Sequence, residues 1–275
     1  MIPKKLPPIF LLLFCMVRQN EMVKLLTIAG LGPGNPKLVT PNVQEAISSA
    51  TDIVGYIPYV ARIPPRDGLV LHPSDNRVEL ERAEFALDLA VSGKKVLIVS
   101  SGDPGVFAMA AAVFEILDKN PSRWNDVEVQ ILPGITAMLA AAAKIGAPLG
   151  HDFCALNLSD NLKPWELIEK RLLLGIEADF AMALYNPRSK SRPEGFKKVL
   201  TILKRECSKD RPIVFARAIS TPEERIQIMT LAQAKPEMAD MQTVVIIGSS
   251  QTKVLLQNGK TFAYTPRYFK LDSPN

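Results

Sequence analysis

The sequence predicts an α/β fold built from two α/β lobes, and three observations support this prediction. Short apolar runs rich in β-branched residues alternate with amphipathic or alanine-rich stretches along most of the chain. Tight turns rich in glycine and proline follow several of the apolar runs. The 275 residues are also enough for a sizeable core, and two domains are a reasonable expectation at this length.

The first half of the chain alternates between strand and helix patterns. Val96–Ser100 is the clearest strand, because four apolar and mostly β-branched residues in a row are typical of a strand buried on both faces. Glu79–Ser92 is the clearest helix, since its apolar residues recur at helical spacing. The expected strands are 25–29, 52–56, 96–100 and 127–132, and the expected helices are 41–49, 79–92, 106–118 and 137–146.

The second half continues the alternation, with one ambiguous stretch and an expected tail. The segment 223–232 fits a short helix or a strand, and the chain from Lys260 onward is expected to be a tail. The expected strands are 153–158, 180–185, 213–216 and 243–247, and the expected helices are 164–174 and 192–206.

The predicted domain boundaries begin with the interpretation of the amino terminus. Lys4 and Lys5 precede the apolar run Ile9–Val17, as in a signal peptide, but this run is too short to span a bilayer and no small-residue cleavage site follows. Residues 1–21 are therefore interpreted as an over-extended start or an idle tail. The predicted lobes are 22–134 and 135–260, and the predicted tail is 261–275.

Charge and cysteine content narrow the class of protein. The net charge of +5 is a mild excess without a block of Lys or Arg, so it suits a small polyanionic substrate as well as it suits nucleic acid. The three cysteines form no metal spacing and no disulfide framework, which indicates a reducing, cytoplasmic compartment. Two histidines and no Cys-x-x-Cys motif indicate that there is no zinc site.

Two glycine–proline turns, Gly30–Pro36 and Ser101–Gly105, follow predicted strands. Small ligands of open α/β sheets bind outside the carboxyl ends of the strands, so both turns are candidate ligand loops. Glycines without a Cβ would let the backbone lie against a ligand. A dinucleotide-binding fingerprint fits the first turn poorly, because Pro33 and Pro36 remove backbone donors that a pyrophosphate needs. A ligand other than a diphosphate is favoured.

Three turns in order carry a family resemblance: Gly30-Leu-Gly-Pro-Gly34, Ser101-Gly-Asp-Pro-Gly105 and Pro133-Gly-Ile-Thr-Ala137. They resemble the signature loops of the tetrapyrrole methylases, over roughly Leu25 to Ser250. The resemblance implies two α/β lobes with the cofactor cleft between them. It also implies S-adenosyl-L-methionine as the methyl donor, a polyanionic tetrapyrrole as the substrate and a homodimer, with neither nucleic acid nor membrane as a partner.

Three further segments narrow the resemblance to one branch of the family. Gly55–Tyr59, Leu184–Ser189 and Phe215–Ala218 look like the branch that acts on precorrin-3B in cobalamin biosynthesis. The resemblance then implies methylation at carbon 17 with contraction of the ring, on precorrin-3B or on its cobalt-bearing counterpart.

The resemblance also implies individual site residues. Many relatives carry an acidic residue where this chain has Tyr56, so Tyr56 is the candidate for handling a proton or orienting the substrate. Loop arginines suit the carboxylates of the substrate, and the candidates are Arg62, Arg66 and Arg188. The implied cofactor contacts are Pro33, Ser101, Gly102, Asp103, Val106, Thr136, Ala137, Asn186, Ala218 and Thr243.

Methyl transfer from a sulfonium is an in-line displacement, which is catalysed mostly by positioning and electrostatics. A site without a metal or a histidine–serine pair is therefore compatible with this chemistry. Several alternatives remain open: another precorrin, RNA or a modified protein histidine as the methyl acceptor, a nucleotide-binding dehydrogenase, or a binding module without catalysis. Each turn glycine taken alone fits a purely structural turn, so the prediction depends on the joint pattern.

Overall fold

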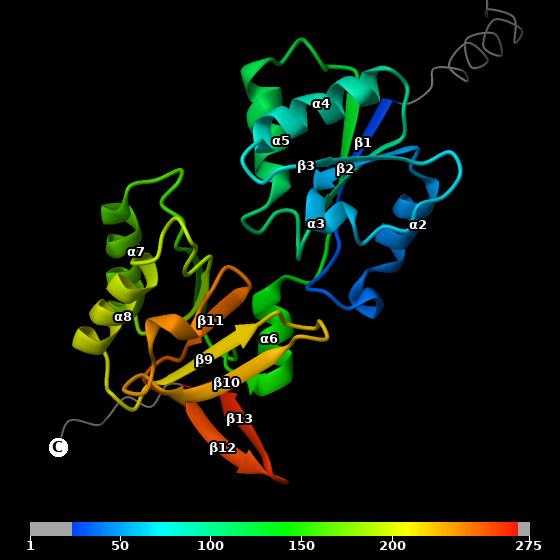
Figure 1. The fold of residues 1–275 in the computed structure, drawn as a ribbon. Coiled ribbons are helices and arrows are strands. Elements are labelled where there is room, and N and C mark those ends of the chain that lie inside the picture. Colours follow the sequence, from blue (N-terminus) through cyan, green and yellow to red (C-terminus); the bar gives the residue numbers. More distant parts are fainter. Residues whose placement is uncertain (1–23, 269–275) are drawn as a thin grey trace, which may run out of the picture. The chain divides into compact units, whose positions relative to one another are not determined.

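The computed structural model describes residues 24–268, and many of its helices and strands are labelled in Figure 1. The predictions for residues 1–21 and for the last part of the tail fall outside these residues. The described residues pack into two compact units. The first contains 24–29, 44–100 and 109–132, and the second contains 30–43, 101–108 and 133–268. The turns after β1 and β4 therefore pack with the second unit, whereas the predicted lobe 22–134 includes them; the lobe boundaries remain predictions.

The first unit is built on a five-stranded sheet with the order β3-β2-β4-β1-β5. β1 pairs with β5 in parallel, and β2 pairs in parallel with both β3 and β4. Every residue of β4 is buried, as the apolar run predicts. The strands are β1 (Lys24–Gly30), β2 (Asp52–Tyr56), β3 (Val70–Ser74), β4 (Val96–Ser100) and β5 (Val127–Leu132).

Helices α4 and α5 pack together and against this sheet. Leu87 of α4 and Val113 of α5 join Ile28 and Ile98 of the strands in one buried cluster. This cluster also buries Trp124, whose indole nitrogen donates to Asp88 at 2.8 Å. The helices between the strands are α2 (Pro41–Ser49), α3 (Ile57–Val60), α4 (Glu79–Val91) and α5 (Met109–Lys119).

The second unit contains a mixed sheet with the order β10-β9-β11-β8-β7. β7 and β8 are parallel, and the pairings of β8 with β11, β11 with β9 and β9 with β10 are antiparallel. The strands are β7 (Phe153–Asn157), β8 (Ala181–Tyr185), β9 (Pro212–Arg217), β10 (Arg225–Thr230) and β11 (Thr243–Ile247). Asn157 and Tyr185 are register partners at the carboxyl ends of β7 and β8.

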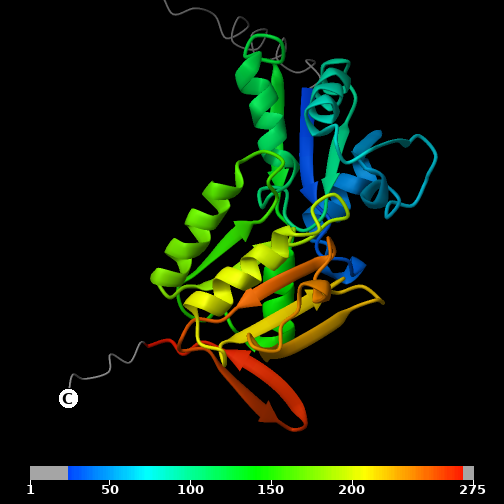
Figure 2. The same cartoon turned by 60° about the vertical axis from the view of Figure 1, so that its left-hand side comes forward.

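Both faces of the mixed sheet are buried, and the period-two alternation of the strands explains how. Ile213 and Phe215 lie in a cluster with α7 (Trp165–Glu177) and α8 (Gly195–Glu206), whereas Val214 and Ala216 lie in a cluster with α6 (Ala137–Ile145). Figure 2 shows this arrangement, with α7 and α8 on one side of the sheet and α6 on the other.

A small third sheet, β12-β13-β6, completes the second unit. β12 (Lys253–Gln257) and β13 (Lys260–Tyr264) form an antiparallel hairpin, and β13 pairs with β6 (Gly146–Ala147). The prediction of a tail from Lys260 is wrong for residues 260–264, because Ala263 is fully buried against α6. The chain turns at Asn258 and Gly259, both with positive φ, which places the two strands side by side.

The α/β fold class is confirmed, and the differences in single elements have local causes. Helix α5 begins at Met109 rather than at 106, because Phe107 has a φ of +54° and cannot lie in a right-handed helix. Helix α8 begins at Gly195, after Pro193. The ambiguous stretch 223–232 contains the strand β10. No helix between residues 24 and 268 combines the length and apolar character needed to cross a membrane.

Candidate functional site

Three turns of the second unit pack into one body, which we name the turn cluster: residues 30–34, 101–105 and 133–137. Gly32 and Gly102 exchange two backbone hydrogen bonds, with N–O distances of 3.1 and 3.0 Å. Both of these glycines have positive φ, of 64° and 62°, which glycine adopts at no steric cost. The first two turns are therefore joined backbone to backbone.

Gly30 and Gly134 are required by the packing of the turn cluster itself. A Cβ on Gly134 would lie 2.1 Å from the carbonyl oxygen of Gly102, and a Cβ on Gly30 would lie 2.4 Å from the same atom. Gly102 is buried, and a Cβ there would lie 3.4 Å from the Cα of Thr136, which is an ordinary contact, so the approach of its backbone to a ligand stays a prediction. Gly105 is exposed.

Asp103 ties the second turn to the third. Its Oδ1 accepts a hydrogen bond from the backbone N–H of Gly105 at 2.8 Å, and its Oδ2 accepts one from Gly134 at 3.1 Å. Because both carboxylate oxygens hold backbone donors, Asp103 positions the loops.

Tyr185, at the end of β8, extends the turn cluster into the mixed sheet. Its hydroxyl lies 2.6 Å from the hydroxyl of Thr136 and accepts a hydrogen bond from the N–H of Met138 at 3.0 Å. Burial raises the pKa of Tyr185, although these hydrogen bonds oppose the shift. Thr136 precedes α6, but its side chain does not cap the helix, because its hydroxyl pairs with Tyr185. Sequence reasoning did not single out Tyr185, although it lies in the quoted segment 184–189.

Strained backbone concentrates near these turns. Among residues 24–268, six non-glycine residues have positive φ, and four of them are Phe107, Asn186, Ala218 and Ser220. Bulky residues adopt this conformation rarely, and such strain is typical of functional sites. Phe107 is also partly exposed, and its ring packs edge-on against Tyr185 with centroids 5.3 Å apart.

Several polar groups near the turn cluster lack a hydrogen-bond partner in the described part of the chain. One is the backbone N–H of Ala137 at the start of α6. Another is the buried hydroxyl of Ser220. The 218–221 turn lies against the first loop, because a Cβ on Gly34 would come within 2.5 Å of Thr221. Both groups are able to bond to a polar ligand there.

The second unit also contains the other predicted cofactor residues. Pro33, Ser101 and Val106 are partly buried in the loops. The side-chain nitrogen of Asn186 donates to Asn157 at 3.1 Å. The Thr243 hydroxyl is occupied, since it donates to Asp240 at 2.8 Å and accepts from the Asp240 N–H at 3.1 Å.

The predicted substrate residues are divided between the units. Tyr56 ends β2 in the first unit, and its ring packs edge-on against Tyr59 with centroids 5.3 Å apart. Burial lowers the pKa of the Arg62 guanidinium. Arg66 donates to the carbonyl oxygens of Ile47 and Ala50 at the end of α2.

Arg188 lies in the second unit, where its Nε donates to the carbonyl oxygen of Pro193 at 3.3 Å. Sequence reasoning therefore placed Arg66 and Arg188 in loops correctly, but both guanidinium groups also bind backbone. Within the described ranges, no three His, Cys, Asp or Glu side chains gather in a way that would hold a metal ion.

Known proteins resemble this chain over most of its length. The profile of the tetrapyrrole (corrin/porphyrin) methylases matches residues 25–235. The chain is 51% identical over 249 residues to the precorrin-3B C(17)-methyltransferase of Sinorhizobium sp, covering 90% of this chain and 98% of that protein. It is 37% identical over 249 residues to the probable cobalt-factor III C(17)-methyltransferase of Salmonella typhimurium, covering 90% and 100% of the two chains. The crystal structure of the methyltransferase CobJ superimposes with a TM-score of 0.84 at 61% identity, over 88% of this chain and 99% of that one.

Proposed function

Because this chain belongs to the tetrapyrrole methylases, we propose that it methylates carbon 17 of precorrin-3B and contracts the ring, in cobalamin biosynthesis. The observation that carries this proposal is the 51% identity to a protein of that name over almost its whole length. The 37% identity to a probable cobalt-factor III enzyme makes the cobalt-bearing substrate the one alternative that an observation favours.

We propose S-adenosyl-L-methionine as the methyl donor, bound at the turn cluster. When bound, it supplies a methyl group made electrophilic by a sulfonium. The unpartnered N–H of Ala137 and the buried hydroxyl of Ser220 support this fit, because a polar ligand would satisfy both. The residues proposed to hold it are Pro33, Ser101, Gly102, Asp103, Val106, Thr136, Ala137, Asn186, Ala218 and Thr243.

The residues of the turn cluster act mainly by positioning. Asp103 fixes the second and third turns to each other, and Tyr185 fixes the side chain of Thr136. Loops held in this way need no reorganisation when reactants arrive, which is how a displacement reaction gains most from its enzyme.

On the substrate side, Tyr56 is proposed to handle a proton or to orient the ring. Arg62, Arg66 and Arg188 are proposed to meet the carboxylates of the tetrapyrrole. Arg66 and Arg188 would do so while also bound to backbone carbonyls.

The assay incubates the full chain with S-adenosyl-L-methionine and either precorrin-3B or its cobalt-bearing counterpart. We expect release of S-adenosyl-L-homocysteine and a product heavier by one methyl group with one of the two. Tyr56→Phe is compared with the parent in the same assay. We expect it to have a lower turnover and an unchanged affinity for S-adenosyl-L-homocysteine. Binding of S-adenosyl-L-homocysteine without turnover of either tetrapyrrole would show that the proposed substrate is wrong.

We also propose a cytoplasmic homodimer. The scattered cysteines support the compartment. The outer strand β12 exposes Val254, Leu255 and Leu256, and an exposed apolar edge strand supports association of two copies. Light scattering coupled to size exclusion is expected to give twice the mass of the chain, and a monomer mass would contradict the dimer.

A further inference from the structure

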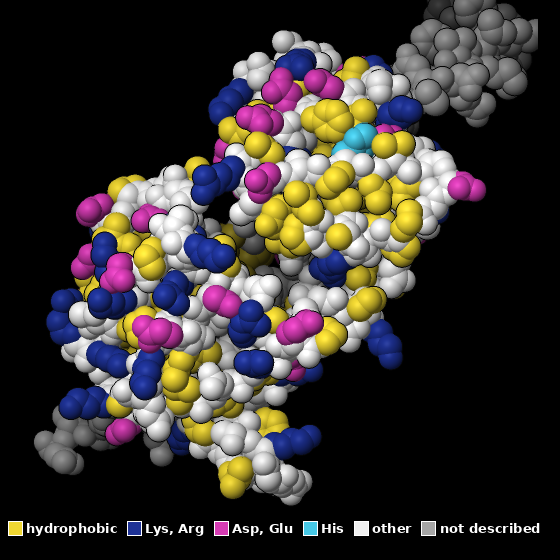
Figure 3. All heavy atoms as spheres, in the orientation of Figure 1, with side chains coloured by type: hydrophobic (Ala, Val, Ile, Leu, Met, Phe, Trp, Pro, Cys, Tyr) yellow, Lys and Arg dark blue, Asp and Glu magenta, His cyan; other side chains and the backbone are white. Residues whose placement is uncertain are grey.

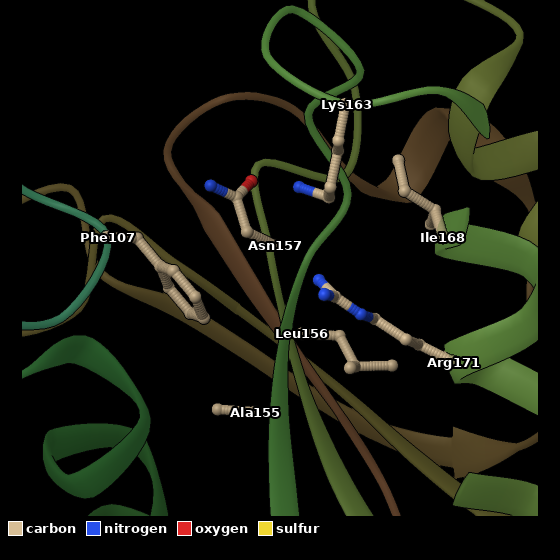
Figure 4. A pocket seen from close by; sticks show the side chains of 7 residues that line it. All are labelled: Phe107, Ala155, Leu156, Asn157, Lys163, Ile168 and Arg171. Carbon is tan, nitrogen blue, oxygen red and sulfur yellow. The ribbon is translucent and has the colours of Figure 1, made fainter. Parts of the chain in front are cut away.

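A second feature of the same unit is a pocket of about 250 Å³ at the carboxyl end of β7. Figure 4 shows its walls, in which Lys163 and Arg171 point their charged ends into the space beside Asn157 and Phe107. We name it the basic pocket. Its lining residues are Phe107, Ala155, Leu156, Asn157, Lys163, Ile168 and Arg171.

The polar groups of the basic pocket are almost entirely donors. The Oδ1 of Asn157 already accepts from the Ser159 N–H at 2.9 Å and from Asn186 at 3.1 Å, which leaves its NH₂ group for a ligand. Lys163 uses one donor on the carbonyl oxygen of Ser159 at 2.9 Å. The guanidinium of Arg171 has no hydrogen bond or ion pair with any residue between 24 and 268. A ligand with several acceptor oxygens would match this set.

Charge also favours an anion in the basic pocket. None of its lining residues is acidic. Burial lowers the pKa of Lys163, and the positive charges of Arg171 and Arg192 lower it further, whereas Asp160 opposes the shift. Asp160 itself lies 3.7 Å from Arg192. Figure 3 shows further Lys and Arg side chains over the face of this unit that carries α7 and α8.

The basic pocket is joined to the turn cluster through two contacts. Phe107 lines the pocket and packs against Tyr185, whose hydroxyl holds Thr136. Asn157 lines the pocket and accepts from Asn186, one of the predicted cofactor residues. The apolar part of the lining, Phe107 and Leu156 among it, suits a flat hydrocarbon body beside the charged group.

We propose that the basic pocket binds a carboxylate of a ligand seated at the turn cluster, held by Lys163, Arg171 and the amide of Asn157. That a ligand binds at the turn cluster, and which ligand it is, rests on the proposed function. The carboxylate has two possible sources, an acetate or propionate arm of the tetrapyrrole or the methionyl carboxylate of the cofactor. The tetrapyrrole arm is favoured by the apolar lining.

The test measures binding by the full chain without any turnover. Uroporphyrin, a stable tetrapyrrole with many carboxylates, is titrated by fluorescence, and S-adenosyl-L-homocysteine is titrated by calorimetry. Lys163→Met and Arg171→Met are each expected to weaken uroporphyrin binding about tenfold, because each loses a charged hydrogen bond. Arg171→Lys is expected to restore part of the loss. Lys170→Met changes an exposed neighbour outside the lining and is expected to have no effect.

Each outcome decides a separate point. Weaker uroporphyrin binding assigns the pocket to the substrate, and weaker S-adenosyl-L-homocysteine binding alone assigns it to the cofactor. Unchanged binding of both ligands by folded variants, checked by circular dichroism, overturns the proposal.

If the parent binds uroporphyrin through this pocket but methylates neither precorrin, the proposed function fails and the pocket stands. If the parent methylates precorrin-3B and the pocket variants bind like the parent, only the pocket proposal fails.

Discussion

The turn cluster and the basic pocket lie in the same unit, but they use their polar groups in opposite ways. In the turn cluster and at its edge, the oxygens of Asp103 and Tyr185 accept hydrogen bonds from backbone N–H groups of the protein itself. In the basic pocket, Arg171 keeps its donors open within the described residues. The turn cluster is therefore held in place by its own hydrogen bonds, whereas the basic pocket has donors that are available to a ligand. Substitutions in the first should therefore change stability and cofactor binding together, and those in the second should change ligand binding alone.

The largest expected effect comes from Gly134→Ala, which attacks the packing of the turn cluster. The new methyl group would overlap the carbonyl oxygen of Gly102, where a Cβ would lie at 2.1 Å. Overpacking against backbone has no cheap relief, so we expect a loss of about 3 kcal/mol of unfolding free energy. Urea denaturation measures it, and binding of S-adenosyl-L-homocysteine should weaken in parallel.

Gly195→Ala is the matched control for Gly134→Ala. Its Cβ would lie 3.7 Å from the carbonyl oxygen of Pro187, an ordinary contact at the start of α8. We expect a change of at most about 0.5 kcal/mol, in either direction. Equal effects of the two substitutions would mean that the overlap at Gly134 is not what makes glycine necessary.

Asp103→Ala should be the next largest change, because it removes the bond between the second and third turns. The N–H groups of Gly105 and Gly134 would lose a charged acceptor, which we expect to cost about 2 kcal/mol. The affinity for S-adenosyl-L-homocysteine should fall about tenfold or more, measured by calorimetry. Asp103→Asn keeps one acceptor oxygen and should fall between the parent and Asp103→Ala.

The exposed Asp67→Ala, in the other unit, serves as the control for charge loss alone. It should leave stability and binding unchanged. An Asp103→Ala variant as stable as Asp67→Ala, but unable to bind the cofactor, would show that Asp103 touches the ligand directly rather than holding the loops.

The sequence predicted the buried strands, because burial on both faces leaves an unbroken apolar run, as in Val96–Ser100, but it missed β3, which has no buried residue. It also located the three turns, since Gly and Pro mark them. It did not reveal that the turns bind one another, because the contact between Gly30, Gly102 and Gly134 joins backbone atoms far apart in the chain. Such a contact depends on the three-dimensional fold, and no motif in the sequence indicates it.

The basic pocket escaped sequence reasoning for a related reason. Lys163 and Arg171 carry no motif, and charged residues in loops and helices are usually solvated. They line one pocket with Phe107 although they lie more than fifty residues away in the chain, and Phe107 has a left-handed backbone conformation that the sequence did not indicate. The β12–β13 hairpin was missed because its strands are short and mostly exposed, so the three apolar residues of β12 do not mark a buried strand.

Tyr185 contacts both regions, because its hydroxyl bonds to Thr136 of the turn cluster and its ring packs against Phe107 of the basic pocket. We expect Tyr185→Phe to change stability less than Asp103→Ala. The Met138 N–H and the Thr136 hydroxyl would each lose a partner, and we expect a loss of about 1 kcal/mol. Since the phenyl ring keeps its contact with Phe107, uroporphyrin binding should change less than binding of S-adenosyl-L-homocysteine, which should weaken about fivefold. Tyr264→Phe, at a partly buried tyrosine of β13, is the control and should leave both affinities unchanged.

The smallest expected effect is that of Asp240, which holds the hydroxyl of Thr243 with two hydrogen bonds. Here too, a carboxylate fixes a neighbouring segment, as Asp103 does in the turn cluster. Burial raises the pKa of Asp240, but hydrogen bonds from Thr243 and Arg217 outweigh it and lower the pKa below the usual 3.8. A carboxylate with a lowered pKa stabilises the fold above its unfolded pKa, and this contribution is lost as the pH falls through the folded value. At neutral pH, the free energy of unfolding of the parent should therefore exceed that of Asp240→Asn by about 0.5 kcal/mol. The difference is small because the Arg217–Asp240 pair is partly exposed and screened by solvent. Thermal unfolding between pH 7 and pH 3 should show this gap narrowing with acid. A gap that stays constant would mean that the Asp240 carboxylate contributes through shape rather than charge.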